Sequence, residues 1–420
     1  MRILWLKTEL LHPVDKGGKI RTYNMLKELK REHEITYLTL DEEADQEARH
    51  LAQEYCDTLI SVPHGTRPKF SAAFYAELVS NLLSPLPYFM KKYESAEMRR
   101  VIEVELARQT FDVLVCDFLQ PSINVPLKLS LPAVLFQHNV EAVIWRRHFE
   151  VQKNPLKRAY LYHQWRKAQH YERQACRRYD FVIAVSQQDC ETMRSEYGVE
   201  HVAYVPTGVD TEYFRPSGSV ASQPHSLVFT GSMDWLPNED AMQYFIKEIL
   251  PLVRQTVPDI RLTIVGRNPY ATLIELSQQD SNITVAGRVD DVRPYIETAT
   301  AFIVPIRIGG GTRLKIYEAM ALEKPVISTS VGAEGLPVND LSELMIANTP
   351  KAFADAIVQV VTNSTLAQEL SNRAAQMVRE KFGWKSVAAE FLKLCEYAIE
   401  NHEVKSAREE PKRAMASGRN

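Results

Sequence analysis

The chain has 420 residues, of which 45% are hydrophobic and 25% are charged, a balance typical of globular proteins with buried cores. Because this length exceeds one ordinary hydrophobic core, it predicts two or three domains. The formal net charge of −3 gives no overall reason to expect nucleic-acid binding, and five scattered cysteines without a CxxC pair predict reduced thiols and no zinc site.

The beginning of the chain, MRILWLKTELL, is a short apolar run interrupted by Lys7 and Glu9, so it lacks the core of a signal peptide. No window approaches the ~18 uncharged apolar residues that a membrane-spanning helix needs. We therefore expect a cytoplasmic protein in which any membrane contact is peripheral.

A strand, a glycine turn, a helix and a second strand open the chain. The strand Ile3 to Lys7 precedes Gly17 and Gly18, which lie just before a helix with an apolar stripe, and the strand Ile35 to Leu40 follows. This unit offers an anion or sugar site. It is not the GxGxxG dinucleotide fingerprint, because the two glycines are adjacent and the third is absent.

Strands and helices continue to alternate, with helices expected near 70–83 and 95–108. The next strands are Leu59–Val62, Phe111–Asp117 and Ala133–Asn139. Strands this uniformly apolar are buried on both faces, which predicts a parallel sheet covered by helices. Ligands collect at the carboxyl ends of such strands, where His138 lies. From this pattern alone His138 is either a structural or a catalytic residue.

Residues 141–178 form a basic and aromatic helical region. Between Arg146 and Arg178 ten Lys or Arg residues face two acids, with tryptophan, tyrosine and phenylalanine interleaved. One interpretation is that this region rests on an anionic membrane surface. The other is an ordinary solvated helix with its aromatic residues packed inward, and Pro155 interrupts any continuous amphipathic pattern.

A Gly, Ser and Pro-rich stretch at 206–225 is interpreted as a linker between two domains, 1–205 and 226–383. The second domain repeats the α/β pattern, and a helix at 384–402 is expected to cross back to the first. Its expected elements include the strands Leu227–Ser232, Ile260–Gly266 and Ile283–Gly287, the helix Asn238–Thr256 and helices within 350–381. The charged tail 403–420 is expected to be disordered.

The densest chemistry lies at 301–336. A strand from Ala301 is followed by Gly309, Gly310 and Gly311 and then by a helix opened by Thr312, an arrangement that directs N–H groups and a helix dipole at an anion. Arg313 and Lys315 in the first turn oppose the dipole unless something negative lies beyond them. We interpret the segment as a cradle for a diphosphate, with Glu318 available for a group bearing hydroxyls. Any single glycine or lysine here would favour a plain turn, whereas three glycines followed by T-R-x-K and Glu318 favour the anion site.

Several segments match one family when they are taken together. They are PVDKGGKIRTYNMLKEL at 13–29, HN at 138–139, DFVIAVS at 180–186, VPTGVDTEYFRP at 205–216, FTGSMDWLPNEDA at 229–241, LTIVGRNP at 262–269 and GGGTRLKIYEAMALEKPVISTSVGAEGL at 309–336. The chain resembles retaining glycosyltransferases of family 4 with the GT-B fold, two Rossmann-like domains that face each other across a nucleotide-sugar cleft. Its details are most similar to bacterial sugar transferases of exopolysaccharide loci.

The resemblance implies roles for individual residues. Glu318 would bind the ribose hydroxyls of the donor, Arg313 and Lys315 would neutralise the leaving diphosphate, and His138 would lie beside the transferred sugar. These four residues are the expected catalytic set. The expected donor-binding residues are Gly17, Gly18, Gly231, Arg267, Asn268, Gly309, Gly310, Gly311 and Thr312, with Arg267 and Asn268 near the nucleobase.

The chain departs from the family pattern at three places. Gly310 stands where relatives often carry the first of two glutamates, the GSMDWLPNED turn lacks the usual basic residues, and Thr207 replaces a common asparagine. No metal-binding acidic pair stands out, since Asp290–Asp291 is expected to cap a helix. We therefore expect transfer without a metal or other cofactor.

The resemblance implies transfer of a hexose from a nucleotide sugar to a glycan or lipid-linked acceptor, with retention of the anomeric configuration. The expected setting is cell-surface polysaccharide synthesis at the inner face of the membrane. Two alternatives stay open at this point: a nucleotide-sugar epimerase or hydrolase on the same fold, and a non-catalytic partner subunit.

Overall fold

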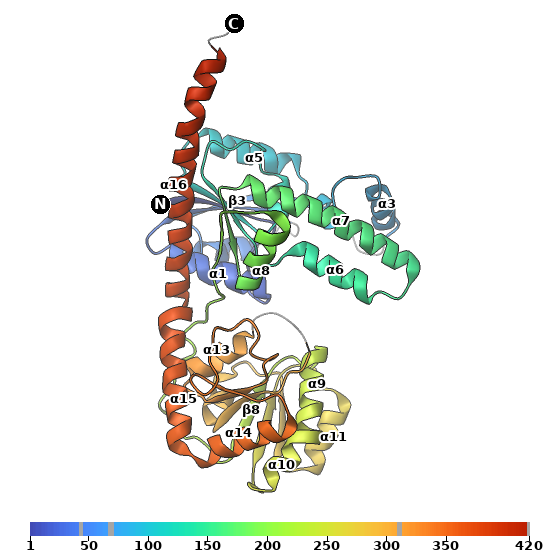
Figure 1. Cartoon of the computed structure of the whole chain (residues 1–420), viewed down its shortest axis with the longest axis vertical. Helices are drawn as coiled ribbons and strands as arrows, with labels where there is room; N and C mark the ends of the chain where they lie inside the picture. Colours follow the sequence, from blue (N-terminus) through green and yellow to red (C-terminus); the bar gives the residue numbers. More distant parts are fainter. Residues whose placement is uncertain (42–44, 66–70, 309–312, 418–420) are drawn as a thin grey trace. The chain divides into compact units, whose positions relative to one another are not determined.

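The computed structural model describes residues 1–41, 45–65, 71–308 and 313–417, with side chains described up to His402 except that of Val151. The chain divides into two compact units, one made of Met1–Pro206 with Val387–Asn420 and the other of Thr207–Ser386. Each unit is described by itself below (Figure 1).

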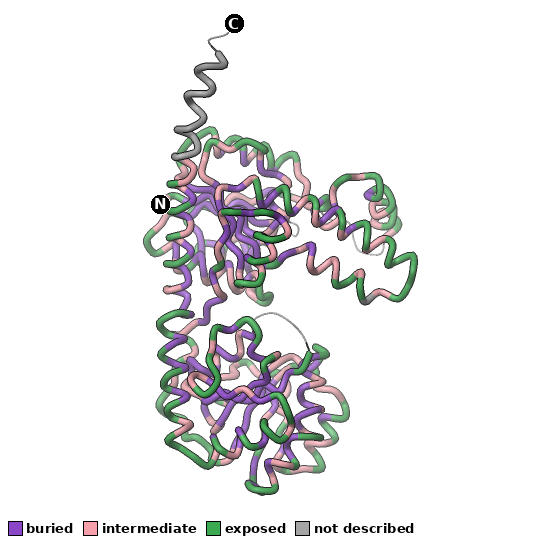
Figure 2. The backbone as a smooth tube through the Cα atoms, in the orientation of Figure 1, coloured by how far each residue is buried: buried purple, intermediate pink, exposed green. Residues whose placement is uncertain are grey.

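The first unit is built on a parallel sheet with the strand order β3-β2-β1-β4-β5-β6-β7. Its strands are β1 (Arg2–Lys7), β2 (Glu34–Asp41), β3 (Thr58–Pro63), β4 (Val113–Asp117), β5 (Ala133–Phe136), β6 (Phe181–Ala184) and β7 (Val202–Tyr204). The central strands are almost wholly buried, as Figure 2 shows in purple, because helices cover both faces of the sheet.

Helices connect these strands. They are α1 (Gly17–Leu29), α2 (Gln46–Leu51), α3 (Ala72–Asn81), α4 (Tyr88–Lys91), α5 (Ala96–Ala107), α6 (Glu141–Val151), α7 (Pro155–Arg178) and α8 (Gln187–Thr192), with short turns η1 (Ala52–Glu54), η2 (Gln120–Ile123) and η3 (Met193–Tyr197). The predicted helical region 141–178 is thus two helices that lie side by side (Figure 1). Asn154 caps α7 by accepting from the Lys157 N–H at 3.1 Å, and Pro155 takes the first helical position, where its missing N–H costs nothing.

The second unit repeats the pattern with the strand order β10-β9-β8-β11-β12-β13. Its strands are β8 (Ser226–Thr230), β9 (Arg261–Val265), β10 (Ile283–Gly287), β11 (Ala301–Val304), β12 (Val326–Ser328) and β13 (Met345–Ile346). Its helices are α9 (Leu236–Tyr244), α10 (Leu250–Arg254), α11 (Ala271–Gln279), α12 (Arg293–Thr298), α13 (Leu314–Ala321), α14 (Pro350–Thr362) and α15 (Ser364–Met377), with the π-helical turns η4 (Phe245–Ile249) and η5 (Val378–Phe382).

The last helix, α16 (Trp384–Ser417), begins in the second unit and continues in the first. Phe391 on α16 packs against Trp5 and Phe136 of the first sheet, with ring centroids 5.4 and 5.0 Å apart. The backbone helix runs beyond residue 403, where the sequence predicted a disordered tail.

Both sheets have the strand order of a Rossmann-like domain. The first three strands run outward to one edge, and the fourth strand then pairs with the other side of the first. The predicted α/β class with two Rossmann-like domains is confirmed. One predicted helix, Asn238–Thr256, is instead α9, a π-helical turn and α10, because Pro251 cannot donate a backbone hydrogen bond in a continuous helix. In each sheet the order reverses between the first and fourth strands, β1 and β4 or β8 and β11. Such a switch point is where ligands bind in open α/β sheets.

Candidate functional site

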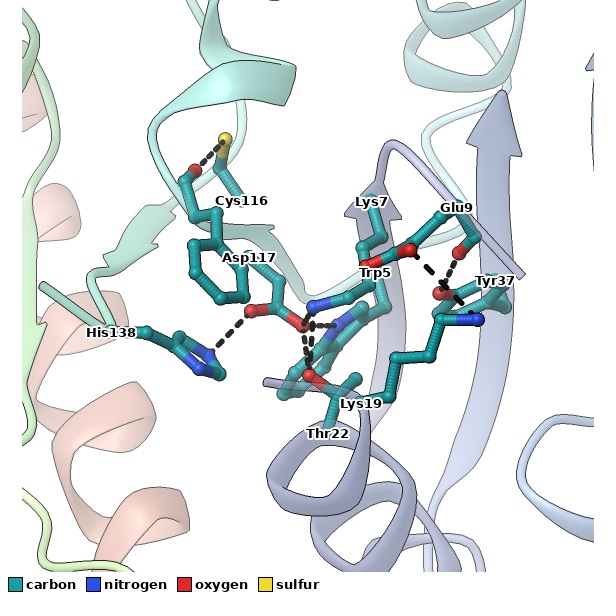
Figure 3. A network of polar contacts seen from close by, with 10 residues as sticks. Trp5, Lys7, Glu9, Lys19, Thr22, Tyr37, Cys116, Asp117 and His138 are labelled. Atoms are coloured by element: carbon teal, nitrogen blue, oxygen red, sulfur yellow. Dashed lines mark hydrogen bonds and ion pairs between the residues drawn. The ribbon is translucent and has the colours of Figure 1, made fainter. Parts of the chain in front are cut away.

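A buried carboxylate stands at the switch point of the first unit (Figure 3). Asp117 ends β4, and its Oδ2 accepts from Trp5 Nε1 at 3.0 Å, Lys7 Nζ at 2.9 Å and Thr22 Oγ1 at 2.6 Å. The other oxygen, Oδ1, lies 2.7 Å from His138 Nε2. We call these five residues the Asp117 cluster. They come from β1, α1, β4 and the segment after β5, so the cluster ties the carboxyl ends of three adjacent strands together.

The Asp117 cluster contains a paired charge and a neutral histidine. Burial raises the pKa of Asp117, but the Lys7 ammonium, His138 and the hydrogen bond from Thr22 together hold this pKa below its ordinary value. Burial lowers the pKa of His138 to about 3, against the opposing effect of Asp117. The imidazole is therefore neutral near pH 7, and the adjacent carboxylate favours the tautomer with the proton on Nε2. Its Nδ1 is left as a hydrogen-bond acceptor.

The predicted glycines Gly17 and Gly18 open α1 beside this cluster. A Cβ on Gly18 would lie 2.7 Å from the ring of Phe118 and 3.9 Å from His138 Nδ1, whereas a Cβ on Gly17 would meet nothing within 4 Å. Phe118 in turn stacks on His138, with ring centroids 3.9 Å apart. The glycine at 18 is thus required by close packing, and the structure brings Gly18 and His138 together as neighbours.

A buried glutamate on α7 holds the segment that carries His138. Glu172 accepts from Gln137 Nε2 at 3.2 Å, from the N–H groups of Glu141 and Ala142 at 2.9 and 3.0 Å, and from Tyr197 Oη–H at 2.8 Å. Burial raises the pKa of Glu172 to about 7. Because these donors lie on both sides of His138 in the chain, Glu172 fixes the position of the segment.

In the second unit, Lys315 reaches from the first turn of α13 to the turn after β8. Its Nζ donates to the Thr230 carbonyl at 2.6 Å and to Asn238 Oδ1 at 3.1 Å, and lies 4.2 Å from the centre of the Phe229 ring. A Cβ on Gly231 would lie 2.8 Å from the same Nζ. The predicted residues Lys315 and Gly231 are therefore in contact, and only a glycine leaves room for the ammonium.

Lys315 and Glu318, near the start of α13, are partly buried, and their contacts do not offset the effect of burial on their pKa values. Burial lowers the pKa of Lys315 to about 7, with a further contribution from the positive charge of Arg313. Burial raises the pKa of Glu318 to about 7, which the positive charge of Lys315 only partly offsets. Among the residues that the structure describes, no hydrogen bond or ion pair holds the Glu318 carboxylate. Burial thus makes the charged form of both groups less favourable, and pKa values shifted in this way are typical of ligand sites.

Arg313 stands at the N-cap position of α13, one residue before the helix begins at Leu314. Its guanidinium carbon lies 5.1 Å from the centre of the Trp235 ring, and burial lowers the pKa of its guanidinium while the charge of Glu334 opposes this shift. The sequence predicted that Thr312 opens this helix. Thr312 and the predicted Gly309, Gly310 and Gly311 lie outside the described residues.

The turn after β9 supplies a cation to the turn after β8. Arg267 Nε donates to Ser232 Oγ at 2.7 Å and lies 3.7 Å from Asp234 Oδ2, while Asn268 Nδ2 donates to the same carboxylate at 2.7 Å. Asn268 has a positive φ of 53°. The turn after β8 contains no basic residue of its own, and Arg267, from the turn after β9, lies next to it.

Sequence reasoning missed several residues of these sites. It did not single out Trp5, Lys7, Thr22, Asp117 or Glu172 in the first unit, nor Trp235 and Asn238 in the second. Charged residues at the ends of otherwise apolar strands, such as Lys7 and Asp117, were the available signal, because a buried charge needs a partner.

The predicted membrane region 141–178 packs much of its aromatic surface within the unit. Phe149 on α6 stacks on Trp165 of α7 at 5.7 Å, and Trp145 stacks on Phe89 at 5.6 Å. Among the described residues no helix combines the length and the apolar character needed to cross a bilayer.

Two family models match the chain. One, described as Glycosyltransferase Family 4, matches residues 16–213, and the other, described as Glycosyl transferases group 1, matches residues 224–363. The chain belongs to the family 4 glycosyltransferases, and its two Rossmann-like domains are those of the GT-B fold.

Two curated relatives show the range of similarity. An uncharacterized 44.6 kDa protein in the cps region of Klebsiella pneumoniae is 20% identical over 405 residues, which cover 93% of this chain and 99% of that protein. A GDP-mannose-dependent alpha-(1-6)-phosphatidylinositol monomannoside mannosyltransferase of Mycobacterium tuberculosis is 24% identical over 230 residues, which cover 50% of this chain and 60% of that protein.

Solved structures share the fold over nearly the whole chain. Sucrose-phosphate synthase from Thermosynechococcus elongatus has a TM-score of 0.64 at 15% identity, with 94% of this chain and 98% of that chain covered. HepE from Anabaena, in complex with UDP, has a TM-score of 0.64 at 13% identity, with 94% and 100% covered. At these identities the likeness shows the fold alone.

Proposed function

We propose that the protein transfers a hexose from a nucleotide-sugar donor to a glycan or lipid-linked acceptor, with retention of the anomeric configuration, during synthesis of a cell-surface polysaccharide. The observation that carries this proposal is the set Arg313, Lys315 and Glu318 at the switch point of the second unit, in a chain of the family 4 glycosyltransferases. Arg313 and Lys315 have lowered pKa values, which an anionic ligand would reverse.

Glycosyl transfer breaks the anomeric C–O bond through an oxocarbenium-like state while a nucleoside diphosphate departs with its charge. Arg313 and Lys315 are suited to neutralise that charge, since preorganised donors of this kind are commonly worth ~3 to 4 kcal/mol each. Glu318 is suited to the ribose, because a carboxylate accepts from two neighbouring hydroxyls at once. Arg267 and Asn268 would lie at the nucleobase.

His138 would act on the sugar as a neutral group. Asp117 lies beside the Nε2 nitrogen of the ring, which leaves Nδ1 as a hydrogen-bond acceptor. A hydroxyl of the transferred sugar is a suitable donor to Nδ1. Gly18 keeps the start of α1 close to this nitrogen. No step of the proposal needs His138 to take up a second proton and become a charged imidazolium.

The relatives support the kind of donor and the setting. The mannosyltransferase of Mycobacterium tuberculosis is described as GDP-mannose-dependent, the HepE structure contains UDP, and the Klebsiella relative is encoded in a cps region. Independence of metals and cofactors stays a prediction, which transfer assayed with and without a chelator would test.

The test is a transfer assay with a panel of UDP- and GDP-sugars and a panel of glycan and lipid-linked acceptors, with product anomers read by NMR. We expect a retained α or β configuration in the wild type. Glu318→Ala, Arg313→Ala and Lys315→Ala should each lose transfer, whereas the exposed controls Glu275→Ala and Lys351→Ala in the same unit should keep it.

Three outcomes would contradict the proposal. Wild-type turnover in all three site variants would show that Arg313, Lys315 and Glu318 take no part in the reaction. Consumption of donor at the same rate without any acceptor would indicate an epimerase or a hydrolase. Donor binding without turnover over the whole acceptor panel would indicate a binding subunit.

A further inference from the structure

One side of α6 borders a pocket of about 270 Å³ in the first unit, which we call the Glu141 pocket. Residues spaced i, i+3, i+4 and i+7 lie on one side of a helix, and α6 lines the pocket with such a set. The partly buried residues of the lining are Phe89, Tyr93, Gln120, Glu141, Ile144 and Trp145. Small-molecule sites begin at ~300 Å³, so a pocket of this size suits a ligand of one ring.

Two aromatic rings form an apolar wall of the Glu141 pocket. Trp145 of α6 stacks on Phe89 of α4, with ring centroids 5.6 Å apart and ring planes inclined by 22°. Phe89, Tyr93 and Trp145 also pack against the hydrophobic core of the first unit. This packing holds the wall in place before a ligand arrives, which limits the cost of ordering on binding. The C–H groups of a sugar ring can pack on an aromatic wall of this kind.

Polar groups beside this wall offer both kinds of hydrogen bond. Glu141 Oε1 accepts from Gln120 Nε2 at 3.3 Å. Among the residues that the structure describes, Glu141 Oε2 and the indole N–H of Trp145 have no hydrogen-bond partner. Burial raises the pKa of Glu141, and the hydrogen bond from Gln120 opposes this shift. Because a hydroxyl both donates and accepts, it is the ligand group that can pair with the carboxylate and with the indole.

The Glu141 pocket adjoins the segment that carries His138. Glu141 begins α6 three residues after His138, and its N–H donates to Glu172 at 2.9 Å. Gln120 lies three residues after Asp117, the last residue of β4. Because β4 and β5 are neighbours in the sheet, the pocket lies at the same carboxyl edge as the Asp117 cluster. A ligand there would be close to the imidazole that we place beside the transferred sugar.

The charges around the Glu141 pocket favour an uncharged ligand. Lys92 is the only Lys or Arg among the described residues of the lining; it is exposed, and its Nζ lies 4.4 Å from the centre of the Tyr93 ring. His148, which also lines the pocket, is exposed. A phosphate beside Trp145 would meet the like charge of Glu141. An acyl chain would leave the Glu141 carboxylate buried without a partner.

We propose that the Glu141 pocket binds one neutral pyranose ring, the terminal sugar of the acceptor, and that Glu141 and Trp145 select it. A sugar hydroxyl would donate to Glu141 Oε2, another would accept from the indole N–H, and the C–H groups of the ring would pack on the aromatic wall. This assignment rests on the proposed function and narrows the acceptor to a molecule that ends in an uncharged sugar.

The experiment is saturation-transfer difference NMR of the full chain with the methyl glycosides of mannose, glucose and galactose, and with inorganic phosphate as a competitor. We expect at least one glycoside to bind the wild type, and phosphate not to displace it. Trp145→Ala and Glu141→Ala should each weaken this binding by roughly tenfold or more, since each removes a hydrogen bond or an aromatic contact. Ile144→Trp should abolish it by filling the pocket, although no polar group is lost.

The matched controls are Glu103→Ala and Tyr204→Ala. They change an exposed acid and a tyrosine that is 40% exposed in the same unit, and both should bind glycosides as the wild type does. Equal binding of UDP by all variants, measured by calorimetry, would show that they fold. In the transfer assay Trp145→Ala should raise the KM for the acceptor and leave the KM for the donor unchanged.

Four outcomes would overturn the inference: no glycoside binds the wild type, Trp145→Ala and Glu141→Ala bind glycosides equally well, phosphate displaces the glycoside, or the acceptor KM is unchanged in Trp145→Ala. Glycoside binding that depends on Glu141, in a protein that transfers no sugar to any acceptor, would support the sugar pocket and contradict the proposed function instead. The two can therefore fail separately.

Discussion

The two units place charged residues at equivalent switch points but balance them in opposite ways. In the Asp117 cluster a carboxylate that is fully buried meets the Lys7 ammonium at 2.9 Å and further donors from Trp5 and Thr22. Near the start of α13 the pKa of Lys315 falls and that of Glu318 rises, each to about 7, because burial is not matched by pairing.

The difference separates a preorganised support in the first unit from a candidate ligand site in the second. A buried network whose central charge is paired resists change and holds its members, among them His138, in one position. A partly buried cation and acid without full partners lower stability in the free protein and gain from a ligand that supplies opposite charge or hydroxyls. Substitutions should therefore affect stability in the first unit and reaction in the second.

The largest expected effect is loss of stability in Asp117→Asn. This change leaves Lys7, which is 1% exposed, without a counter-charge, and breaking one partner of a buried pair costs about 3 to 5 kcal/mol. Urea denaturation followed by fluorescence would measure it. Asp112→Asn is the matched control, because it breaks an exposed pair with Arg2 between the same strands and should cost less than about 1 kcal/mol.

A double variant checks the cause of this loss. Lys7→Met combined with Asp117→Asn removes the stranded ammonium, so it should recover a large part of the stability that Asp117→Asn loses. Equal losses in Asp117→Asn and Asp112→Asn would show that the Asp117 cluster is not the stabilising network described above.

Glu318→Gln should show the opposite behaviour. We expect transfer to fall roughly 10- to 100-fold, the usual value of hydrogen bonds to a charged group. Because the pKa of Glu318 in the folded state is raised to about 7 from its ordinary value, ionisation costs stability as pH rises from 4.5 to 7, and that cost persists above 7. The variant should therefore be more stable than the wild type at pH 8.

Thermal unfolding at two pH values would measure this change in stability. We expect the Tm of Glu318→Gln to exceed that of the wild type by roughly 2 to 4 °C at pH 8. The advantage should shrink toward pH 5, where the wild-type carboxyl is already protonated in the folded state. A variant that is less stable than the wild type at pH 8 would show that Glu318 is a structural residue.

Gly18→Ala should have an intermediate effect on the first unit. The added Cβ would lie 2.7 Å from the Phe118 ring, which stacks on His138, so overpacking should cost about 1 to 3 kcal/mol and displace the imidazole. Gly17→Ala is the control, since its Cβ would meet nothing within 4 Å. Denaturation and transfer assays on both variants would test the contrast, and equal behaviour would contradict it.

Local patterns in the sequence were enough to predict most strands and the position of Gly17 and Gly18 at the start of α1. Runs such as Ala301–Val304 and Arg261–Val265 are apolar and bounded by turn residues, so each can be recognised within a few positions. The strand β13 (Met345–Ile346) was missed because two residues carry no periodicity. The break in Asn238–Thr256 depends on Pro251, a signal that was present but not used.

The contacts within the Asp117 cluster could not be predicted, although its charged strand ends were visible, because its members are distant in the chain. Lys7 and Asp117 are 110 residues apart, and only the pairing of β1 with β4 brings them together. By contrast, Arg313, Lys315 and Glu318 share one helix and its cap, so their proximity follows from helical spacing. Sequence reasoning therefore grouped the three residues that are neighbours in the chain and missed the Asp117 cluster, which depends on strand order.

The smallest expected effect is the pH dependence of UDP binding. Because the pKa of Lys315 in the free protein is lowered to about 7, the ammonium is lost as pH rises above this value, and a bound diphosphate should restore it. We expect the affinity for UDP to fall between pH 7 and 8.5 by at most about tenfold per pH unit. Calorimetry across this range would measure the change.

Proton uptake separates Lys315 from other causes of this pH dependence. Calorimetry at pH 8 in two buffers with different ionisation enthalpies should show that UDP binding takes up a proton in the wild type. The uptake should disappear in Lys315→Met and persist in Lys351→Met, which changes an exposed lysine of the same unit. If the wild type takes up no proton at pH 8, the diphosphate does not meet Lys315, and the charge imbalance at the start of α13 serves another ligand.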